Sequence, residues 1–175
     1  MKAIFVVDMV NGFCKEGALY SNNIESIIVP IKNFLETQYK DNDIYFLNDA
    51  HSSDDIEMQS YPIHCLKNSK ESQVVDELKK YAKNIIEKNS TNSFFALKKE
   101  ILSKYDSFEI IGCCSDICIL QFAITLKTYF NHLKQNREII VFKNLIATFN
   151  IPNHNSQEYH DFALNLMANA GIKIK

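Results

Sequence analysis

The stretch Phe108–Leu126 reads FEIIGCCSDICILQFAITL and decides the fold of this 175-residue chain. The apolar run 108–111 predicts a buried strand, which Gly112 ends. Ser115 is a suitable helix N-cap, and from Ile117 onward apolar residues recur at helical spacing. A strand therefore passes through a very short turn into a helix, which is the beginning of a βα unit.

Cys118 falls in the first turn of this predicted helix. A helix N-terminus favours a thiolate over a thiol, and its free N–H groups can hold an oxyanion. The position therefore suits a nucleophilic cysteine. A free cysteine is also commonly a small apolar residue that packs a helix, and these residues alone leave both interpretations open.

The composition is that of a soluble globular domain, with 46% hydrophobic and 23% charged residues. A formal net charge of −2 argues against nucleic acid or a membrane surface as the main partner. No apolar segment approaches membrane-spanning length, and the N-terminus does not have the pattern of a signal peptide. We therefore expect a cytoplasmic protein, in which the five cysteines are catalytic, metal-bound or simply buried.

Strand and helix patterns alternate along the whole chain. The predicted strands span residues 2–8, 43–48, 84–87, 108–112, 138–143 and 172–174. The predicted helices span residues 23–39, 71–81, 94–105, 115–131 and 156–170, with Pro30 positioned to kink or divide the first and Gly171 to end the last. This order predicts an α/β fold with a mostly parallel sheet of six strands, in a single domain covering residues 1–175.

Polar residues follow the predicted strands at the points where they end. Asp8, Asp49, His51, Lys88 and the turn before Cys118 all take such positions. In open parallel sheets, ligands bind outside the carboxyl ends of the strands. We therefore expect these residues to converge on one site.

Asp8, Lys88 and Cys118 have the chemistry of a thiol hydrolase. Asp8 could accept the thiol proton and return it to a leaving amine, while Lys88 could hold Asp8 ionised and stabilise developing negative charge. Each residue also has an ordinary alternative, because strand-end aspartates often cap turns and most lysines are solvated at the surface.

The polar loop 52–70 is long for a compact domain. Asp49 and His51 precede it with a spacing that points both side chains the same way in extended backbone, and Glu57 and His64 lie within it. Two imidazoles and two carboxylates suit a zinc, manganese or iron ion with positions left for water or substrate. The spacing matches no standard metal motif, so a polar surface loop with scattered histidines is the alternative.

Together these segments resemble a known family. The segments are VVDMVNGF at 6–13, DAH at 49–51 followed by the stretch 57–64, the stretch 88–94, and GCCSDICI at 112–119. In order and spacing they resemble the isochorismatase-like cysteine hydrolases and, within these, the nicotinamidases.

The resemblance implies a Rossmann-like three-layer α/β/α fold and a catalytic triad of Asp8, Lys88 and Cys118. It also implies a non-proline cis peptide between Cys113 and Cys114. The N–H groups of Cys114 and Cys118 would form the oxyanion hole.

The nicotinamidase resemblance implies in addition a divalent metal, with zinc expected first and manganese or iron as alternatives. The ligands would be Asp49, His51 and His64, and Glu57 matches a position that varies among family members. This metal would hold the pyridine nitrogen of the substrate.

Phe13 and Tyr61 match aromatic residues that sandwich the nicotinamide ring, although Tyr61 taken alone could be an ordinary half-buried tyrosine. Thr91 departs from the family pattern, which has an aromatic residue there, and could admit a different amide. The remaining histidines, His132, His154 and His160, are expected at the surface.

The implied activity is hydrolysis of nicotinamide to nicotinate and ammonia through a thioester on Cys118. The alternatives are an isochorismatase-family hydrolase acting on another small amide or on isochorismate, and a binding module without activity. The expected partner is a small amide, and homo-oligomers are common in the family.

Overall fold

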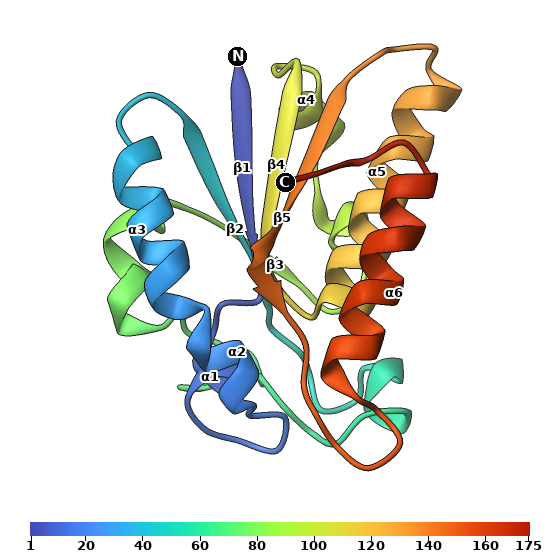
Figure 1. Cartoon of the computed structure of the whole chain (residues 1–175). Helices are drawn as coiled ribbons and strands as arrows, with labels where there is room; N and C mark the ends of the chain where they lie inside the picture. The colour runs from blue at the N-terminus through green and yellow to red at the C-terminus, as the bar shows by residue number, and fades with distance from the viewer.

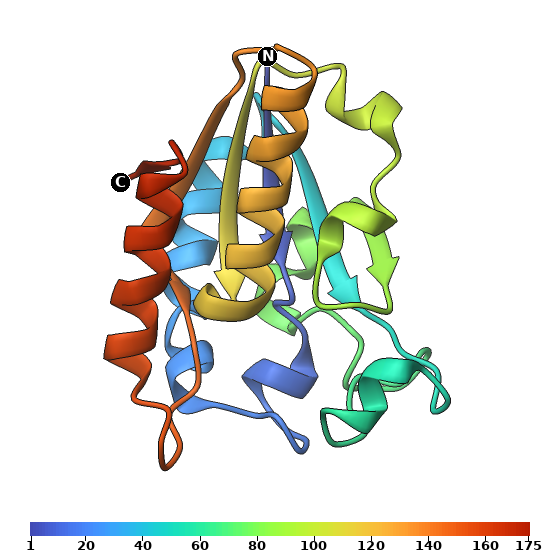
Figure 2. The same cartoon turned by 90° about the vertical axis from the view of Figure 1, so that its right-hand side faces the viewer.

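The computed structural model describes residues 1–175, in which one six-stranded sheet lies between two layers of helices (Figure 1, Figure 2). Its strands are β1 (Lys2–Val7), β2 (Asp43–Asp49), β3 (Asn84–Lys88), β4 (Ser107–Cys113), β5 (Glu138–Ala147) and β6 (Lys173–Ile174). Their order in the sheet is β3-β2-β1-β4-β5-β6, and every pairing is parallel. The predicted α/β class and the six strands are confirmed.

The helices divide between the two faces of the sheet. One face carries α1 (Asn11–Cys14), α2 (Asn22–Ser26) and α3 (Ile28–Gln38), and the other carries α4 (Lys99–Leu102), α5 (Leu120–His132) and α6 (Ser156–Asn169) (Figure 1, Figure 2). The predicted helix 23–39 is divided at Ile27, ahead of Pro30, into α2 and α3. Gly171 adopts a φ of 84° just beyond α6, as its predicted role in ending that helix requires.

Strand β1 lies at the centre of the sheet and is covered on both faces. Ala3, Phe5 and Val7 pack in one buried cluster with residues of α5 and α6. Ile4 and Val6 pack in the other cluster, with residues of α3. This explains why the strand is a continuous apolar run instead of an alternating one.

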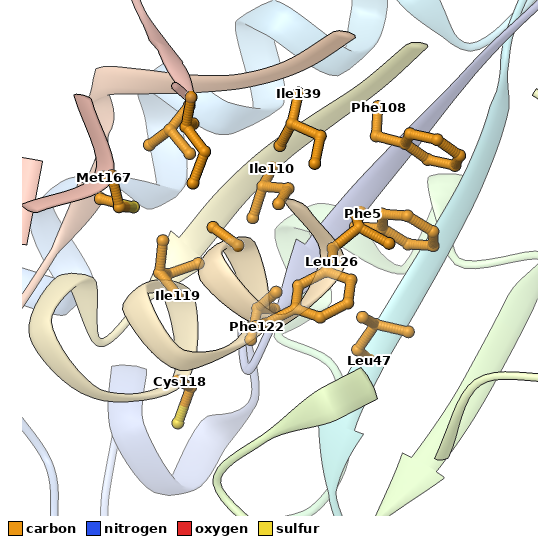
Figure 3. Packing of buried hydrophobic residues seen from close by; sticks show 14 of the residues in the cluster. Phe5, Leu47, Phe108, Ile110, Cys118, Ile119, Phe122, Leu126, Ile139 and Met167 are labelled. Carbon is orange, nitrogen blue, oxygen red and sulfur yellow. The ribbon is translucent and has the colours of Figure 1, made fainter. Parts of the chain in front are cut away.

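Aromatic side chains form much of the core on the α5 side. Phe5 stacks on Phe108 with ring centroids 5.9 Å apart and meets Phe122 of α5 edge-on at 5.3 Å. Figure 3 shows these rings together, whereas the sulfur of Cys118 points away from them. The helix that carries Cys118 is thus held by its apolar face while the thiol remains available for another purpose.

The predicted helix 71–81 is wrong over its first half. Residues before 76 run alongside the chain that follows β1, where the N–H of Asn11 donates to the Gln73 carbonyl and that of Gly12 to the Glu71 carbonyl, both at 2.9 Å. Only the 3₁₀ turn η2 (Asp76–Tyr81) is helical. Hydrogen bonds to a distant segment therefore outweigh a local helical pattern.

The predicted helix 94–105 is also wrong as a continuous element. It consists of the short 3₁₀ turn η3 (Ser93–Ala96) and the short helix α4, joined through extended backbone at Leu97 and Lys98. Leu97 is buried in the core beneath α5, and an uninterrupted helix would not follow this path. No helix of the protein has both the length and the apolar character needed to cross a membrane.

Candidate active site

The turn that carries Cys118 begins with a close approach between two strands. Gly112 has a φ of 117°, and a Cβ atom at this position would lie 2.0 Å from the carbonyl oxygen of Val7. Only glycine fits both the backbone conformation and the space. The end of β4 is thereby held directly against the end of β1, next to Asp8.

The turn itself differs in detail from the predicted helix start. The Cys113–Cys114 peptide bond is cis, as the resemblance implied. Cys114 and not Ser115 takes the N-cap position, and the chain then makes one π-helical turn, η4 (Ser115–Ile119), before α5. The hydroxyl of Ser115 faces inward and lies 3.2 Å from Nδ1 of His160. The predicted capping role of Ser115 is therefore wrong.

Asp8, Asp49 and Lys88 meet at the carboxyl ends of strands β1, β2 and β3. Lys88, at the end of β3, reaches Oδ2 of Asp8 at 2.9 Å and also pairs with Oδ1 of Asp49. The N–H of Asp49 donates to the other oxygen of Asp8, at 2.9 Å. Lys88 is 4% exposed and is therefore not the solvated surface lysine of its ordinary alternative, and Asp8 beside it is 1% exposed.

Burial dominates the electrostatics of these groups. Burial, followed by repulsion from Asp49, raises the pKa of Asp8 to about 7, although Lys88 and hydrogen bonding from Cys118 oppose the shift. The pKa of Lys88 is raised well above its ordinary value, because attraction to Asp49 and Asp8 outweighs the opposing effect of burial. Lys88 is thus a fixed positive charge, while Asp8 changes charge near neutral pH.

The Cys118 thiol does not behave as its place at a helix start predicts. Burial raises its pKa well above the ordinary value, and the nearby charge of Lys88 only partly offsets this. The thiol therefore keeps its proton in the free protein, and the expected thiolate is absent at neutral pH. A nucleophilic role requires a base that takes the proton as the sulfur attacks. Asp8 can serve as this base, because its carboxylate accepts a hydrogen bond from Cys118.

One backbone donor in this turn is unused. The carbonyl of Cys114 accepts the N–H groups of Ile117 and Ile119 at 3.2 and 3.1 Å, whereas the N–H of Cys114 donates to no backbone group. Cys114 and Cys118 both line the same cavity. A free N–H beside a thiol is the arrangement that an oxyanion hole needs.

Three of the four predicted metal ligands lie together. Asp49, His51 and His64 are buried, and one potential ligand atom of each lies within 4.8 Å of the other two. The Nε2 atoms of His51 and His64 each lie 3.6 Å from a carboxylate oxygen of Asp49. This separation is too long for a hydrogen bond and leaves room for an ion among the three.

The opposite ring nitrogens are already engaged. Nδ1 of His51 lies 3.1 Å from Oδ2 of Asp55, and Nδ1 of His64 lies 2.7 Å from the Pro62 carbonyl. Nε2 of His51 is buried without any hydrogen-bond partner. Imidazoles held at one nitrogen and free at the other are typical of metal ligands, and a buried unpaired nitrogen is costly unless something binds it. The donor set therefore fits a divalent cation.

Glu57, the fourth predicted ligand, lies outside this group of three. Its Oε1 accepts the N–H of Thr91 at 2.7 Å, and both residues line the cavity. Its part in metal binding stays a prediction. Sequence pattern does not reveal the contacts of Asp55 and the Pro62 carbonyl with the two histidines, because such supporting contacts depend on how the loop turns back on itself.

A cavity of about 390 Å³ opens beside Cys118, Asp49 and His64. Phe13 and Tyr61 line it, and their rings lie 5.7 and 6.2 Å from that of His64. Further lining residues that the sequence pattern did not single out are Ala18, Leu19, Tyr20, Ile117, Phe149 and Ile151. They come from loops far apart in the chain, so only the folded structure brings them together.

Two of the three remaining histidines are only partly exposed. The side chain of His154 is 12% exposed and pairs with Asp116, and that of His160 is half-buried against Ser115. Only His132, at the end of α5, is exposed as expected.

Comparison with known proteins identifies the family. The model of the isochorismatase domain matches residues 2–174, so the chain belongs to the isochorismatase family of hydrolases. Nicotinamidase 1 of Arabidopsis thaliana is 26% identical over 179 residues, which cover 86% of this chain and 71% of that protein.

Solved structures show the same fold. A nicotinamidase from Bacillus subtilis is 26% identical with a TM-score of 0.77, covering 99% of this chain and 98% of its own. The pyrazinamidase/nicotinamidase of Streptococcus mutans is 24% identical with a TM-score of 0.83, and the alignment covers both chains fully. The pyrazinamidase of Pyrococcus horikoshii, solved in complex with zinc, is 24% identical with a TM-score of 0.80 and covers 99% and 98%.

Proposed function

We propose that this hydrolase is a cysteine amidohydrolase that converts nicotinamide to nicotinate and ammonia. One observation carries the proposal. Cys118, Asp49 and His64 line one cavity whose other lining residues are mainly apolar, and the buried pair of Asp8 and Lys88 and the buried His51 lie directly behind Asp49. This arrangement supports an acyl-transfer centre and a site for a ring nitrogen within the reach of one small substrate.

In the proposed reaction the Cys118 sulfur attacks the carboxamide carbon while Asp8 takes the thiol proton. Asp8 then gives this proton to the departing nitrogen, so that ammonia leaves and a thioester remains. Asp8, ionised again, takes a proton from the water that attacks the thioester. The acid then leaves and the proton returns to the thiol.

Lys88 and the backbone support the charges of this sequence. The fixed cation of Lys88 favours the ionised form of Asp8, which is the form that accepts the proton. The N–H groups of Cys114 and Cys118 stabilise the oxyanion, and each such donor is typically worth ~3 kcal/mol of barrier.

The residues Asp49, His51 and His64 would hold the divalent cation, with zinc as the first candidate. Bound there, the cation would accept the pyridine nitrogen and so orient the ring between Phe13 and Tyr61. Asp55 and the Pro62 carbonyl keep the two imidazoles turned toward that point.

Ammonia release from nicotinamide by metal-replete protein tests the activity. Cys118→Ala should lower kcat by ~10⁴-fold or more, as loss of a nucleophile does in other hydrolases. Benzamide has the same size but no ring nitrogen, and should give a kcat/KM ~100-fold lower. If the Cys118→Ala variant still hydrolyses nicotinamide, the mechanism is refuted. If the unaltered, metal-replete protein does not hydrolyse it, nicotinamide is not the substrate.

A second candidate is the hydrolysis of a bulkier small amide. Thr91 lines the cavity where the family resemblance led us to expect an aromatic side chain, and its hydroxyl is turned to Gln121 at 3.2 Å. Thr91→Phe would fill this space. If the natural substrate is nicotinamide itself, KM for nicotinamide should change less than threefold; if it is a ring-substituted amide, kcat/KM for that amide should fall ~10-fold or more.

A binding module without activity is the remaining alternative. The extent to which each cysteine is alkylated at rising pH, measured by mass spectrometry, distinguishes an enzyme from such a module. Cys118 lines the cavity, whereas Cys14, Cys65 and Cys113 do not. Selective labelling of Cys118 is expected. Equal resistance of all these cysteines would contradict the nucleophilic role.

A further inference from the structure

One wall of the cavity is formed by the loop 148–155, which connects β5 to α6. Phe149 and Ile151 of this loop line the cavity. The loop turns back tightly on itself, because Ile151 and His154 exchange backbone hydrogen bonds of 3.0 and 3.3 Å. Its position against the rest of the site therefore depends on what holds this small hairpin.

His154 holds the hairpin through an unusually complete set of contacts. Its ring lies between those of Phe149 and Tyr159, with centroids 4.0 and 3.9 Å away. Its Nε2 lies 2.8 Å from Oδ2 of Asp116, and its Nδ1 lies 3.1 Å from the Phe149 carbonyl. Asp116 belongs to η4, the same turn that carries Cys118. The contact thus joins the cavity wall to the turn of the candidate nucleophile.

Both partners of the His154 ring are acceptors when Asp116 is ionised. A neutral imidazole has a single N–H and can donate to only one of them. Both contacts are hydrogen bonds if His154 carries a second proton, or if Asp116 carries the proton and donates it to Nε2. In either arrangement the pair holds one proton more than a neutral imidazole beside a carboxylate.

We propose that His154 is a positioning residue, which fastens the loop 148–155 to the Cys118 turn through one proton that it shares with Asp116. While the pair holds this proton, Phe149 and Ile151 stay against the cavity. Loss of this proton at high pH leaves a single N–H for two acceptors, so the hydrogen bond to either Asp116 or the Phe149 carbonyl is lost and the wall loosens. The kinetic part of this inference rests on the proposed function, whereas the structural part does not.

Other titratable groups surround the pair. They are Cys118 from η4, Glu158, Tyr159, His160 and Asp161 from α6, and Tyr61 from the loop after η1 (Ile56–Gln59). His160 is the one other imidazole nearby, so the test must separate it from His154.

Hydrogen exchange of the whole chain tests the inference without any substrate. The measured quantity is the protection of backbone amides in 149–155, corrected for intrinsic exchange, at about pH 6 and about pH 8.5, a range in which imidazoles titrate. In the unaltered protein, protection should fall ~10-fold between these values, as expected for loss of a charge-assisted hydrogen bond. In His154→Ala, protection of these amides should be as low at both pH values as it is in the unaltered protein at the higher pH.

Asp116→Asn gives the sharper result. The asparagine amide can donate to Nε2 of a neutral His154, whose Nδ1–H then donates to the Phe149 carbonyl, so that both hydrogen bonds persist without an extra proton. Protection of the loop should therefore stay high at both pH values. Two matched variants, His132→Ala at the exposed end of α5 and His160→Gln on α6, should keep the pH response of the unaltered protein.

Kinetics give an independent readout. His154→Ala should raise KM for nicotinamide ~10-fold at about pH 6 and change kcat by less, and the ratio of KM values should shrink by about pH 8.5. The inference is overturned if loop protection is the same in His154→Ala as in the unaltered protein, or if Asp116→Asn keeps the original pH response. Failure to turn over nicotinamide would refute the proposed function alone, because the exchange result still decides the role of His154.

Discussion

The two ends of the same sheet carry hollows of similar size but different character. At the amino ends of the strands, a hollow of about 460 Å³ is lined mainly by polar residues, among them Lys2, Lys40 and Asp43. At the carboxyl ends, the cavity of about 390 Å³ is lined mainly by apolar residues around Cys118. Figure 1 shows the N-terminus, and with it the amino ends of the strands, at the top of the view.

Both ends also contain an ion pair of almost the same length. The N-terminal ammonium group and Asp106 lie 3.0 Å apart with both groups more than 70% exposed, whereas Lys88 and Asp8 lie 2.9 Å apart with 2% and 1% exposed side chains. Exposed pairs contribute ~0–1 kcal/mol, while breaking a buried pair costs ~3–5 kcal/mol. Neither the size of a hollow nor the length of an ion pair marks the functional end. The distinguishing feature is charge held away from water.

The largest effect is expected from removing the buried positive charge of Lys88. Lys88→Met would leave Asp8 and Asp49 as neighbouring buried carboxylates, with an expected loss of ~3–5 kcal/mol in the free energy of unfolding. It should also lower kcat/KM by ~10²–10³-fold, as loss of electrostatic support for a reacting centre does. Lys40→Met at the opposite end should change stability by less than ~0.5 kcal/mol. Urea denaturation and amidase kinetics measure both, and equal effects of the two variants would contradict the comparison.

Glycine substitutions test the backbone at the two ends. Gly112→Ala would place a Cβ 2.0 Å from the Val7 carbonyl oxygen, so the ends of β1 and β4 must separate and we expect a loss of ~3 kcal/mol or more. Gly171→Ala, at the far end of α6, meets only the flexible side chain of Lys127 at 3.3 Å, and only its φ of 84° resists the change, at ~1 kcal/mol. Midpoints of thermal or urea unfolding would show the order, and a reversed order would be inconsistent with this structure.

Two neighbouring aspartates, Asp54 and Asp55, provide a test within the loop 52–70, which carries the candidate metal ligand His64. Asp55 holds Nδ1 of His51, whereas Asp54 is exposed and contacts only Ser52. Asp55→Ala should weaken zinc binding ~10–100-fold, as loss of a residue that orients a ligand typically does. Asp54→Ala should leave the affinity unchanged, and competition with a chromogenic chelator measures both. Identical affinities would show that His51 needs no such support.

Asp8 and Asp106 both pair with a cation, yet their pKa values move in opposite directions. Burial raises the pKa of Asp8 to about 7, and hydrogen bonding to the N-terminus lowers that of Asp106 below its ordinary value. Only ionised Asp8 can accept the thiol proton, so kcat/KM should rise ~10-fold per pH unit below about pH 6 and level off above about pH 8. Carbon-13 NMR of the carboxyl groups would assign each value directly. A flat kcat/KM profile across this range would exclude Asp8 as the base.

Much of this arrangement was predictable from local pattern. The apolar runs predict strands at 2–8 and 108–112, and the structure has strands at Lys2–Val7 and Ser107–Cys113, within one residue at each end. Both predictions are confirmed. Because parallel strands end at a common edge, Asp8, Asp49, Lys88 and Cys118 could be expected together before any side-chain position was known.

Other features could not be predicted from local pattern. The segments 71–81 and 94–105 have helical spacing, but the first half of one follows the chain after β1 and the other breaks at Leu97 to bury that side chain. His154 pairs with Asp116, which lies 38 positions away in the chain. Periodicity shows which face of an element is apolar, but it does not show which distant segment of the chain will pack against that element.

The sequence by itself determined the α/β order, the strand ends and the residue types that gather at one edge of the sheet. The reason is that alternating apolar periods and glycine positions act locally, within one element or one turn. Only the tertiary structure decided that the Cys118 thiol keeps its proton, that Asp8 changes charge near neutral pH and that His154 ties the cavity wall to the Cys118 turn. These properties arise from burial and from distances between segments remote in sequence, which exist only once the chain has folded.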